Sequence, residues 1–474
     1  MFLFILKYEC LSLKANRLLT LLAVITSLLF LFAFYDGYKR ITFQHQTINE
    51  IQEQEKADFK KYRGQIASAK PGQHFDGGHF GDPTNPFYFG NRMGAKYAVL
   101  PPAPLSIIAS GQSDIYPYYF KVTLSKKQAL YHSEELENPR VLFNGRFDVS
   151  FVVIFLLPLL IIAFTYSVYS SEKENGTLLL LMAQNYSVKK IIAYRFVTRY
   201  LLFVCFVSVC LLAGLLCFSA HSFDSFRNVV TVFGSIWLYA AFWFSVAYFI
   251  NSLQKSSGFA ASALTGIWLL LLLIIPTVIS SLIDMVHPMP SKLDLITKTR
   301  NVSDSIAQNK NIINRFLEEH PEFKPANTDP NDKNPIRLRS RIEVETAMEK
   351  EVADYVATAA KREATVNRYR FFSPAIFLQQ ILNKSAGTDD DRYKKFDKAV
   401  VSYQQQFRNY FEPLVYRQEK FTVTHLDGVP NFTIANEATS SINTKNIKTD
   451  FLWLIFLVVL TLFVAQFKKV ANLH

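Results

Sequence analysis

The hydrophobic residues of this chain are concentrated in six stretches of 17 to 25 residues that contain no Asp, Glu, Lys or Arg. A helix of about 20 residues crosses the ~30 Å hydrocarbon core of a bilayer, and each charge at its centre would cost about 2.5–3.5 kcal/mol. We therefore predict an integral membrane protein with six transmembrane helices, at residues 18–35, 151–169, 200–219, 229–250, 258–282 and 451–467.

The charge distribution predicts the orientation of these helices. Six crossings leave both termini on one side, and the connections on that side carry eleven Lys and Arg against three Glu. An excess of basic residues in short loops is typical of the cytoplasmic side. We expect both termini in the cytoplasm. The two large outer regions, 36–148 and 283–450, are nearly neutral, with 39 basic and 35 acidic residues, so we do not expect nucleic acid as a partner.

The polar regions also carry secondary-structure signals. Residues 1–17 combine an apolar stripe with a basic face, which is typical of an amphipathic helix on the inner membrane surface. Residues 41–69 favour a helix that continues out of the membrane, whereas the Gly, Pro and aromatic residues that follow favour loops and short strands.

The second outer region reads as mostly helical. Met348, Val352, Tyr355, Ala359 and Val366 share one face of a predicted helix over 339–369, and 391–416 predicts another. We expect an all-α polytopic membrane protein with two extracytoplasmic regions, mainly helical with some short strands, and a cytoplasmic tail at 468–474.

Motifs for catalysis and nucleotide binding are absent from the sequence. No Gly is followed by Lys, which excludes a Walker A loop, and neither an H-E-x-x-H nor a G-x-S-x-G motif occurs. We therefore expect no enzyme activity and no cofactor in this chain. Two clusters contain residue types that can ligate a metal, but a solvated loop and interfacial packing are the favoured interpretations, and we predict no metal site at His74, Asp76 and His79 or at Met285, His287 and Met289.

The inner connection 170–199 carries the most specific motif. It reads E-x-E-x-G-T-L-L-L-L from Glu172, followed by a polar break and basic residues. Gly176 permits a sharp turn at the membrane surface. A compact loop between two membrane helices could transmit a push from a soluble partner, although a plain interfacial turn would also explain it.

This pattern resembles the inner coupling segment of ABC-2 type permeases, which contacts the ATP-binding subunit. The amphipathic start and six crossings are similar to the plan of that family. Val188 stands where the family often has a proline near Ser187. The resemblance implies that the residues contacting the ATPase subunit are Glu172, Glu174, Gly176, Thr177, Leu178, Tyr186, Ser187, Lys189 and Lys190.

A narrower resemblance covers most of the chain. One subgroup of ABC-2 permeases has large outer insertions after its first and fifth membrane helices, and its extra region is described only as a domain of unknown function. The first insertion is similar to Pro101–Ser106 with Asp114–Pro117, and the second to Ser373–Ala375, Ala386–Asp389 and Phe396.

The resemblance implies a permease that works as a dimer, with itself or with a sister permease, and with two ATPase subunits that bind ATP and Mg. It also implies a location in the inner membrane of a bacterium. It favours export, and an importer is the alternative. The outer regions could dock a periplasmic partner, and membrane lipid surrounds the helices. A second hypothesis is an ATP-driven mechanical or assembly device that transports nothing. A third, a membrane-anchored enzyme or receptor without an ATPase, is disfavoured by the absent catalytic motifs.

Overall fold

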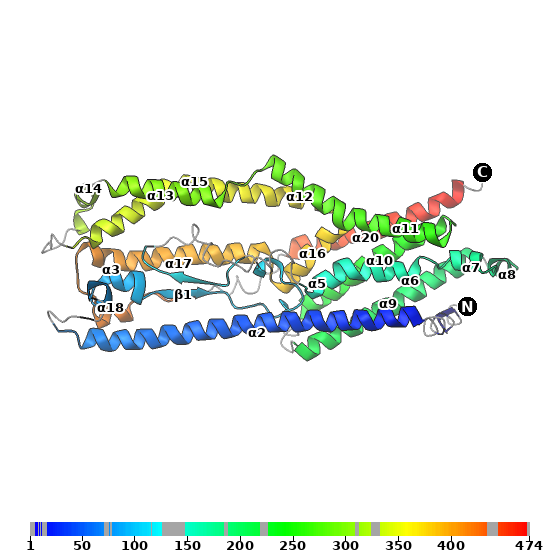
Figure 1. Cartoon of the computed structure of the whole chain (residues 1–474), viewed down its shortest axis with the longest axis horizontal. Helices are drawn as coiled ribbons and strands as arrows, with labels where there is room; N and C mark the ends of the chain where they lie inside the picture. Colours follow the sequence, from blue (N-terminus) through cyan, green and yellow to red (C-terminus); the bar gives the residue numbers. More distant parts are fainter. Residues whose placement is uncertain are drawn as a thin grey trace.

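The computed structural model describes residues 5–7, 9, 11, 17–70, 75, 78–114, 116–125, 147–183, 188–218, 226–308, 312–323, 332–433 and 444–471. The molecule is elongated (Figure 1): a bundle of apolar helices forms one end, and a second, mainly helical domain forms the other. Both termini lie at the bundle end.

Among the described residues, five helical stretches are long and apolar enough to cross a membrane, namely Leu19–Ala67, Val149–Glu174, Lys190–Phe218, Phe226–Ser252 and Ser257–Val286. A further apolar helix, α20 (Thr444–Ala471), contains a shorter apolar run over Thr449–Ala465. The prediction of a mainly helical protein with several membrane-compatible helices is thus confirmed, while the count of six crossings stays a prediction.

The central helix of the bundle is α10 (Phe226–Ser252). It packs against α20, α6 (Leu157–Thr165) and α9 (Val188–Phe218), and its large side chains Tyr239 and Trp243 are 1% exposed. The helix buries its side chains on several faces because neighbours surround it, as expected for a helix that is apolar all round.

Two prolines in the bundle are each preceded by a π-helical turn. The turns are η5 (Val152–Leu156), between α5 (Val149–Phe151) and α6, and η7 (Leu270–Ile274), between α11 (Ser257–Leu269) and α12 (Ile275–Val286). Proline has no N–H and clashes with the carbonyl four residues earlier, and a wider turn relieves that clash.

Carbonyl groups in these turns are bonded by side chains. Tyr239 Oη donates to the Ile154 carbonyl at 2.8 Å, and Trp268 Nε1 donates to that of Phe155 at 3.2 Å. In η7 the Leu271 carbonyl accepts a bond from Ser373 Oγ at 2.9 Å. An unpaired carbonyl is costly in lipid, so these side chains help to make both prolines tolerable there.

The second domain contains the two predicted outer regions, and we call it the outer domain. It is built around the continuation of α2 (Arg17–Ala67), a single 51-residue helix that runs from the bundle to the far end (Figure 1). Strands β1 (Lys96–Val99) and β2 (Tyr119–Val122) form one antiparallel pair, with Lys96 opposite Val122. Short turns complete this part of the chain: η1 (Gly78–Gly81), α3 (Pro86–Tyr88), η2 (Phe89–Met93) and η3 (Gly111–Asp114).

The described parts of the predicted second outer region (283–450) are mostly helical, as predicted. They comprise α13 (Lys292–Ala307), α14 (Ile312–Glu319), η8 (Pro321–Phe323), α15 (Asn334–Tyr369), η9 (Arg370–Phe372), α16 (Pro374–Ala386), α17 (Asp390–Tyr416) and α18 (Val423–Asp427). The two predicted outer regions share one core, which contains stacked aromatic rings, including Phe89 and Phe421, whose centroids are 4.4 Å apart.

The predicted apolar face of α15 is only partly correct. Met348 is buried, and Val352 and Tyr355 are half-buried, but Ala359 is exposed. Helix α15 packs mainly on α13, α12 and α14, and these neighbours do not cover the position of Ala359. In contrast, α16 shares the hydrophobic core of the bundle through Ala375, Leu378, Leu382 and Ala386.

Candidate functional site

The inner connection folds as two short helices joined by a tight turn. Helix α7 (Ser170–Glu174) ends at Asn175, Gly176 follows with φ of +73°, and α8 (Leu178–Met182) begins two residues later. A Cβ at position 176 would meet nothing within 4 Å, so the left-handed backbone, rather than lack of space, requires glycine here.

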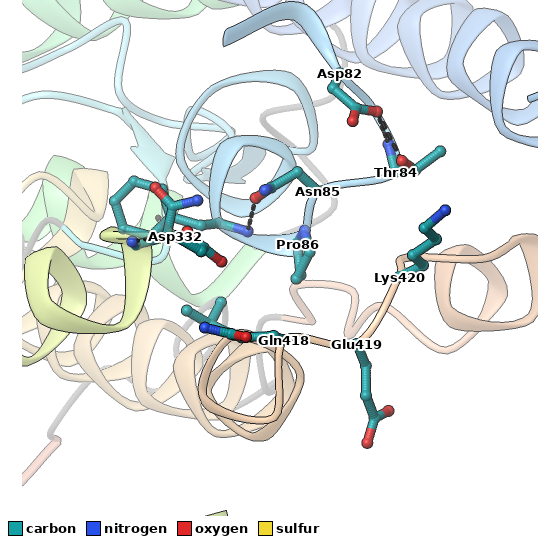
Figure 2. Close-up of a pocket in the computed structure, with 11 residues that line it drawn as sticks. Asp82, Thr84, Asn85, Pro86, Asp332, Gln418, Glu419 and Lys420 are labelled. Atoms are coloured by element: carbon teal, nitrogen blue, oxygen red, sulfur yellow. Dashed lines mark hydrogen bonds between the residues drawn. The ribbon is translucent and has the colours of Figure 1, made fainter. Parts of the chain in front are cut away.

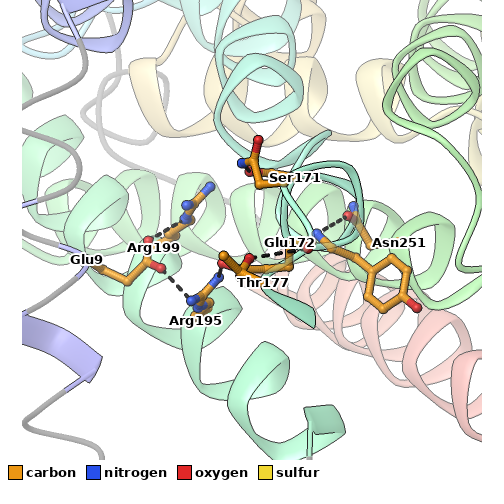
Figure 3. A network of polar contacts seen from close by, with 9 residues as sticks. Glu9, Ser171, Glu172, Thr177, Arg195, Arg199 and Asn251 are labelled. Atoms are coloured by element: carbon orange, nitrogen blue, oxygen red, sulfur yellow. Dashed lines mark hydrogen bonds and ion pairs between the residues drawn. The ribbon is translucent and has the colours of Figure 1, made fainter. Parts of the chain in front are cut away.

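A chain of ion pairs joins α7 to α9 and to the N-terminal segment (Figure 3). Glu172 Oε1 lies 2.7 Å from Arg195 Nη1, and Thr177 donates its hydroxyl proton to the other carboxylate oxygen. Glu9 lies between the two arginines of α9, 3.4 Å from Arg195 Nε and 2.7 Å from Arg199 Nε.

This cluster of two glutamates and two arginines is electrically neutral and largely withdrawn from solvent. The Glu9 side chain is 1% exposed, and the other three charged side chains are 11–17% exposed. Arg199 also donates to the Phe164 carbonyl near the end of α6. The cluster therefore fastens three segments that lie far apart in sequence.

Two further contacts hold the connection against the bundle. The buried Asn251 side chain accepts a bond from the Tyr169 N–H at 3.2 Å and donates to the Thr165 carbonyl at 3.0 Å. Glu174 Oε1 accepts from the Ser257 N–H, at the first residue of α11, at 2.9 Å. A carboxylate there complements the free N–H groups and the dipole of the helix N-terminus.

The predicted site residues are thus brought together in part. Glu172, Gly176 and Thr177 belong to the arrangement around Arg195, whereas Glu174 reaches a different helix. Leu178 is half-buried at the start of α8, and Lys190 is exposed near the start of α9. Tyr186 and Ser187, and the side chain of Lys189, lie outside the described part of the chain.

Sequence reasoning missed four residues of this site: Glu9, Arg195, Arg199 and Asn251. The two arginines lie four residues apart, and hence on one face of a helix, which is a usable signal. Their partner Glu9 lies about 190 positions away and shares no local pattern with them.

The surface beyond the cluster is apolar and exposed. Leu179 and Leu180 of α8 are 74% and 68% exposed, at the end of the molecule opposite the outer domain (Figure 1). The connection is thus attached to α9, α10 and α11 and has an exposed apolar surface at its tip. The side chains of His74, Asp76 and His79 lie outside the described residues. Among the described residues, no group of three His, Cys, Asp or Glu is placed to hold a metal ion.

A second polar feature lies in the outer domain, far from the bundle. A shallow pocket of about 130 Å³ is lined by Asp82, Asn85, Asp332 and Lys420, among others (Figure 2). Asp82 accepts from Thr84 N–H at 2.8 Å, and Asp332 accepts from a backbone N–H at 2.9 Å. These carboxylates therefore stabilise local turns.

The fold and this site define a polytopic membrane protein with an inner connection that is locked to several apolar helices. The family model described as "Domain of unknown function (DUF3526)" matches residues 292–435, which run from α13 past the end of α18. Comparisons with curated proteins and with solved structures gave no match.

Proposed function

We propose that the chain is the membrane-spanning permease subunit of an ABC-2 type transporter, working with a separate ATPase subunit that binds ATP and Mg. The proposal rests on the motif E-x-E-x-G-T-L in the connection 172–178. The observation that carries it is the attachment of this segment to α9, α10 and α11 through Arg195, Asn251 and Ser257.

The geometry supports a specific transmission route. When the ATPase subunits close on ATP, they would push on α7 and α8. Glu172 pairs with Arg195 of α9, and Glu174 caps α11, so the push would act on both helices together. The contact between Tyr169 and Asn251 would pass it to α10 as well. Tilting these helices would open a path at the interface of two permease subunits, identical or sister chains, in the inner membrane with both termini cytoplasmic. Export is the favoured direction, and import is the alternative.

The test uses the complex of this chain with its ATPase subunit in liposomes. We expect Glu174→Ala and Gly176→Ala to reduce the stimulation of ATP hydrolysis by the permease several-fold while the complex stays assembled. Lys255→Ala, which removes an exposed charge from the nearby turn between α10 and α11, serves as the matched control. Full stimulation in both site variants would exclude the coupling role.

A second candidate function is a mechanical or assembly device that moves a periplasmic partner and transports nothing. The hydrogen bonds that connect the helical bundle with the outer domain favour this function. Asp148, at the start of α5, accepts bonds from the N–H and hydroxyl of Ser110 at 2.8 and 2.9 Å. Arg40 of α2 bonds the side chain of Ser113 at 2.7 Å and the Ser106 carbonyl.

These bonds join the outer end of the second apolar stretch to α2, which continues unbroken through the outer domain. A tilt at the inner end would therefore move the outer domain as a lever. Spin labels at Phe80 of two copies would report this: the lever predicts a change in their separation on ATP hydrolysis without loss of a trapped solute from proteoliposomes. Release of the solute with unchanged separation would favour transport and contradict the lever.

A further inference from the structure

The turn between α15 and α16 lies beside the apolar helices rather than in the outer domain. Arg362 of α15 donates to the His287 carbonyl, just beyond α12, at 2.8 Å. Eleven residues later, Ser373 Oγ bonds the Leu271 carbonyl of η7, which lies within the predicted fifth crossing (258–282). The end of α15 therefore runs beside α12, and η9 (Arg370–Phe372), which follows it, lies next to the apolar turn η7. Helix α16 begins directly after this contact (Figure 1).

The positive charge in this turn is neutralised and shielded. Arg370 Nη2 lies 2.7 Å from Asp450 Oδ1, and the two side chains are 11% and 1% exposed. The other terminal nitrogen of Arg370, Nη1, donates to Gln380 Oε1 at 2.8 Å. The guanidinium lies 5.1 and 5.0 Å from the ring centroids of Phe371 and Phe377. Pairing and aromatic shielding are what a charged side chain needs at the edge of an apolar layer.

The outer face of the same turn is aromatic and exposed. Tyr369 is 43% and Phe372 is 63% exposed. Between them, Phe371 packs on Trp453 of α20, with centroids 5.2 Å apart, and Trp453 stacks on Phe456 at 4.9 Å. The aromatic surface is thus continuous with the exposed apolar face of α20.

Such residues favour one particular surrounding. Tyr and Trp concentrate at the membrane–water interface, where an apolar ring and a polar group are both satisfied. Arg368, exposed next to Tyr369, has a side chain long enough to reach phosphate headgroups while its stem covers apolar surface.

We propose that Tyr369 and Phe372 insert into the outer layer of the membrane, so that η9 is a lipid anchor for the arm formed by α13 and α15. The occupant of this surface is lipid, because the surface continues that of α20 and places a basic side chain beside the rings. The Arg370–Asp450 pair fixes the turn at this level. The inference does not depend on the transporter proposal, since it requires only that α20 and η7 face lipid.

The experiment measures the surroundings of a nitroxide at position 372 in the full chain, reconstituted in phosphatidylcholine–phosphatidylglycerol liposomes. Its four cysteines, Cys10, Cys205, Cys210 and Cys217, are first replaced by alanine, and Phe372→Cys is labelled. Phe80→Cys, at an aromatic residue of similar exposure (58%) in the outer domain, is the matched control.

We expect the ratio of collisions with oxygen to collisions with a water-soluble nickel chelate to be several-fold higher at position 372 than at 80. Tyr369→Cys gives the same comparison if the first variant does not fold. An equal or lower ratio at 372 and 369 would overturn the proposal, since the turn would then lie in water. Dipolar broadening between labels of two copies would also overturn it, by showing a protein partner in place of lipid.

Discussion

Replacing Glu9 by Gln tests whether the buried ion pairs hold the inner connection to the bundle. The substitution keeps the shape of the side chain and removes the negative charge between Arg195 and Arg199. Arg195 keeps Glu172 as an ionic partner, whereas Arg199 keeps the uncharged Phe164, through its carbonyl and its ring. Most of the cost should therefore fall on Arg199.

The size of the effect follows from the burial of the pair. Two charges about 4 Å apart interact by about 4 kcal/mol at an effective dielectric constant of about 20, and breaking a buried pair costs about 3–5 kcal/mol. Because Arg199 is 13% exposed rather than fully buried, water can reach it, and we expect the free energy of unfolding to fall by about 3 kcal/mol.

The assay is a double-mutant cycle with Glu9→Gln and Arg199→Gln, in which unfolding in mixed detergent micelles is followed by tryptophan fluorescence. We expect a coupling energy of about 2 kcal/mol between the two positions. Lys190→Gln, which removes an exposed charge from the same helix, should change stability by less than about 0.5 kcal/mol. A coupling energy as small as that of the control would refute the reasoning.

Three further predictions concern local interactions. Tyr239→Phe leaves the Ile154 carbonyl of the π-helical turn without its 2.8 Å bond and should lower stability by about 1–3 kcal/mol in the same unfolding assay; an unchanged midpoint would contradict this. Gly176→Ala should cost only about 1–2 kcal/mol, since its penalty is the positive φ and not a clash; a larger loss of thermal stability would point to unseen contacts. Burial, and then the neighbouring Asp391, raise the pKa of Asp389 to about 6, so its folded form holds a proton that the unfolded form releases from about pH 4. Stability should therefore fall as the pH rises from about 4 to 6, by at most about 3 kcal/mol, and Asp389→Asn should flatten this part of a pH–melting curve; an identical slope in the variant would show the pKa to be unshifted.

Local signals were sufficient to predict the apolar helices and most of the outer helices. An uncharged run such as 229–250 specifies its membrane helix by composition alone, and the apolar spacing around Met348 specifies a helix without reference to its neighbours. The exposure of Ala359 could not be predicted in this way, because it depends on which helices pack against the second half of α15.

The candidate site was predictable only where its residues are close in sequence. Glu172, Gly176 and Thr177 form one motif, but Glu9 meets Arg199 across about 190 residues. Likewise, nothing in the composition around Ser373 distinguishes an outer loop from a turn that satisfies a carbonyl of the apolar helix η7. Long-range partners of this kind depend on how the helices assemble and not on a local pattern.

The contacts of the acidic residues indicate which charges on the proposed inner side are available to a partner. Only three acids, Glu9, Glu172 and Glu174, accompany eleven basic residues there. The first two pair with Arg195 and Arg199, and the third caps α11, so each is already held within the chain. The charges of Glu9 and Glu172 are thereby offset, and an approaching surface meets the remaining bases, such as the exposed Lys190. Acidic lipid headgroups match that field, as would an acidic rim on the ATPase subunit that we propose, and charge attraction would bring either to the apolar tip formed by Leu179 and Leu180.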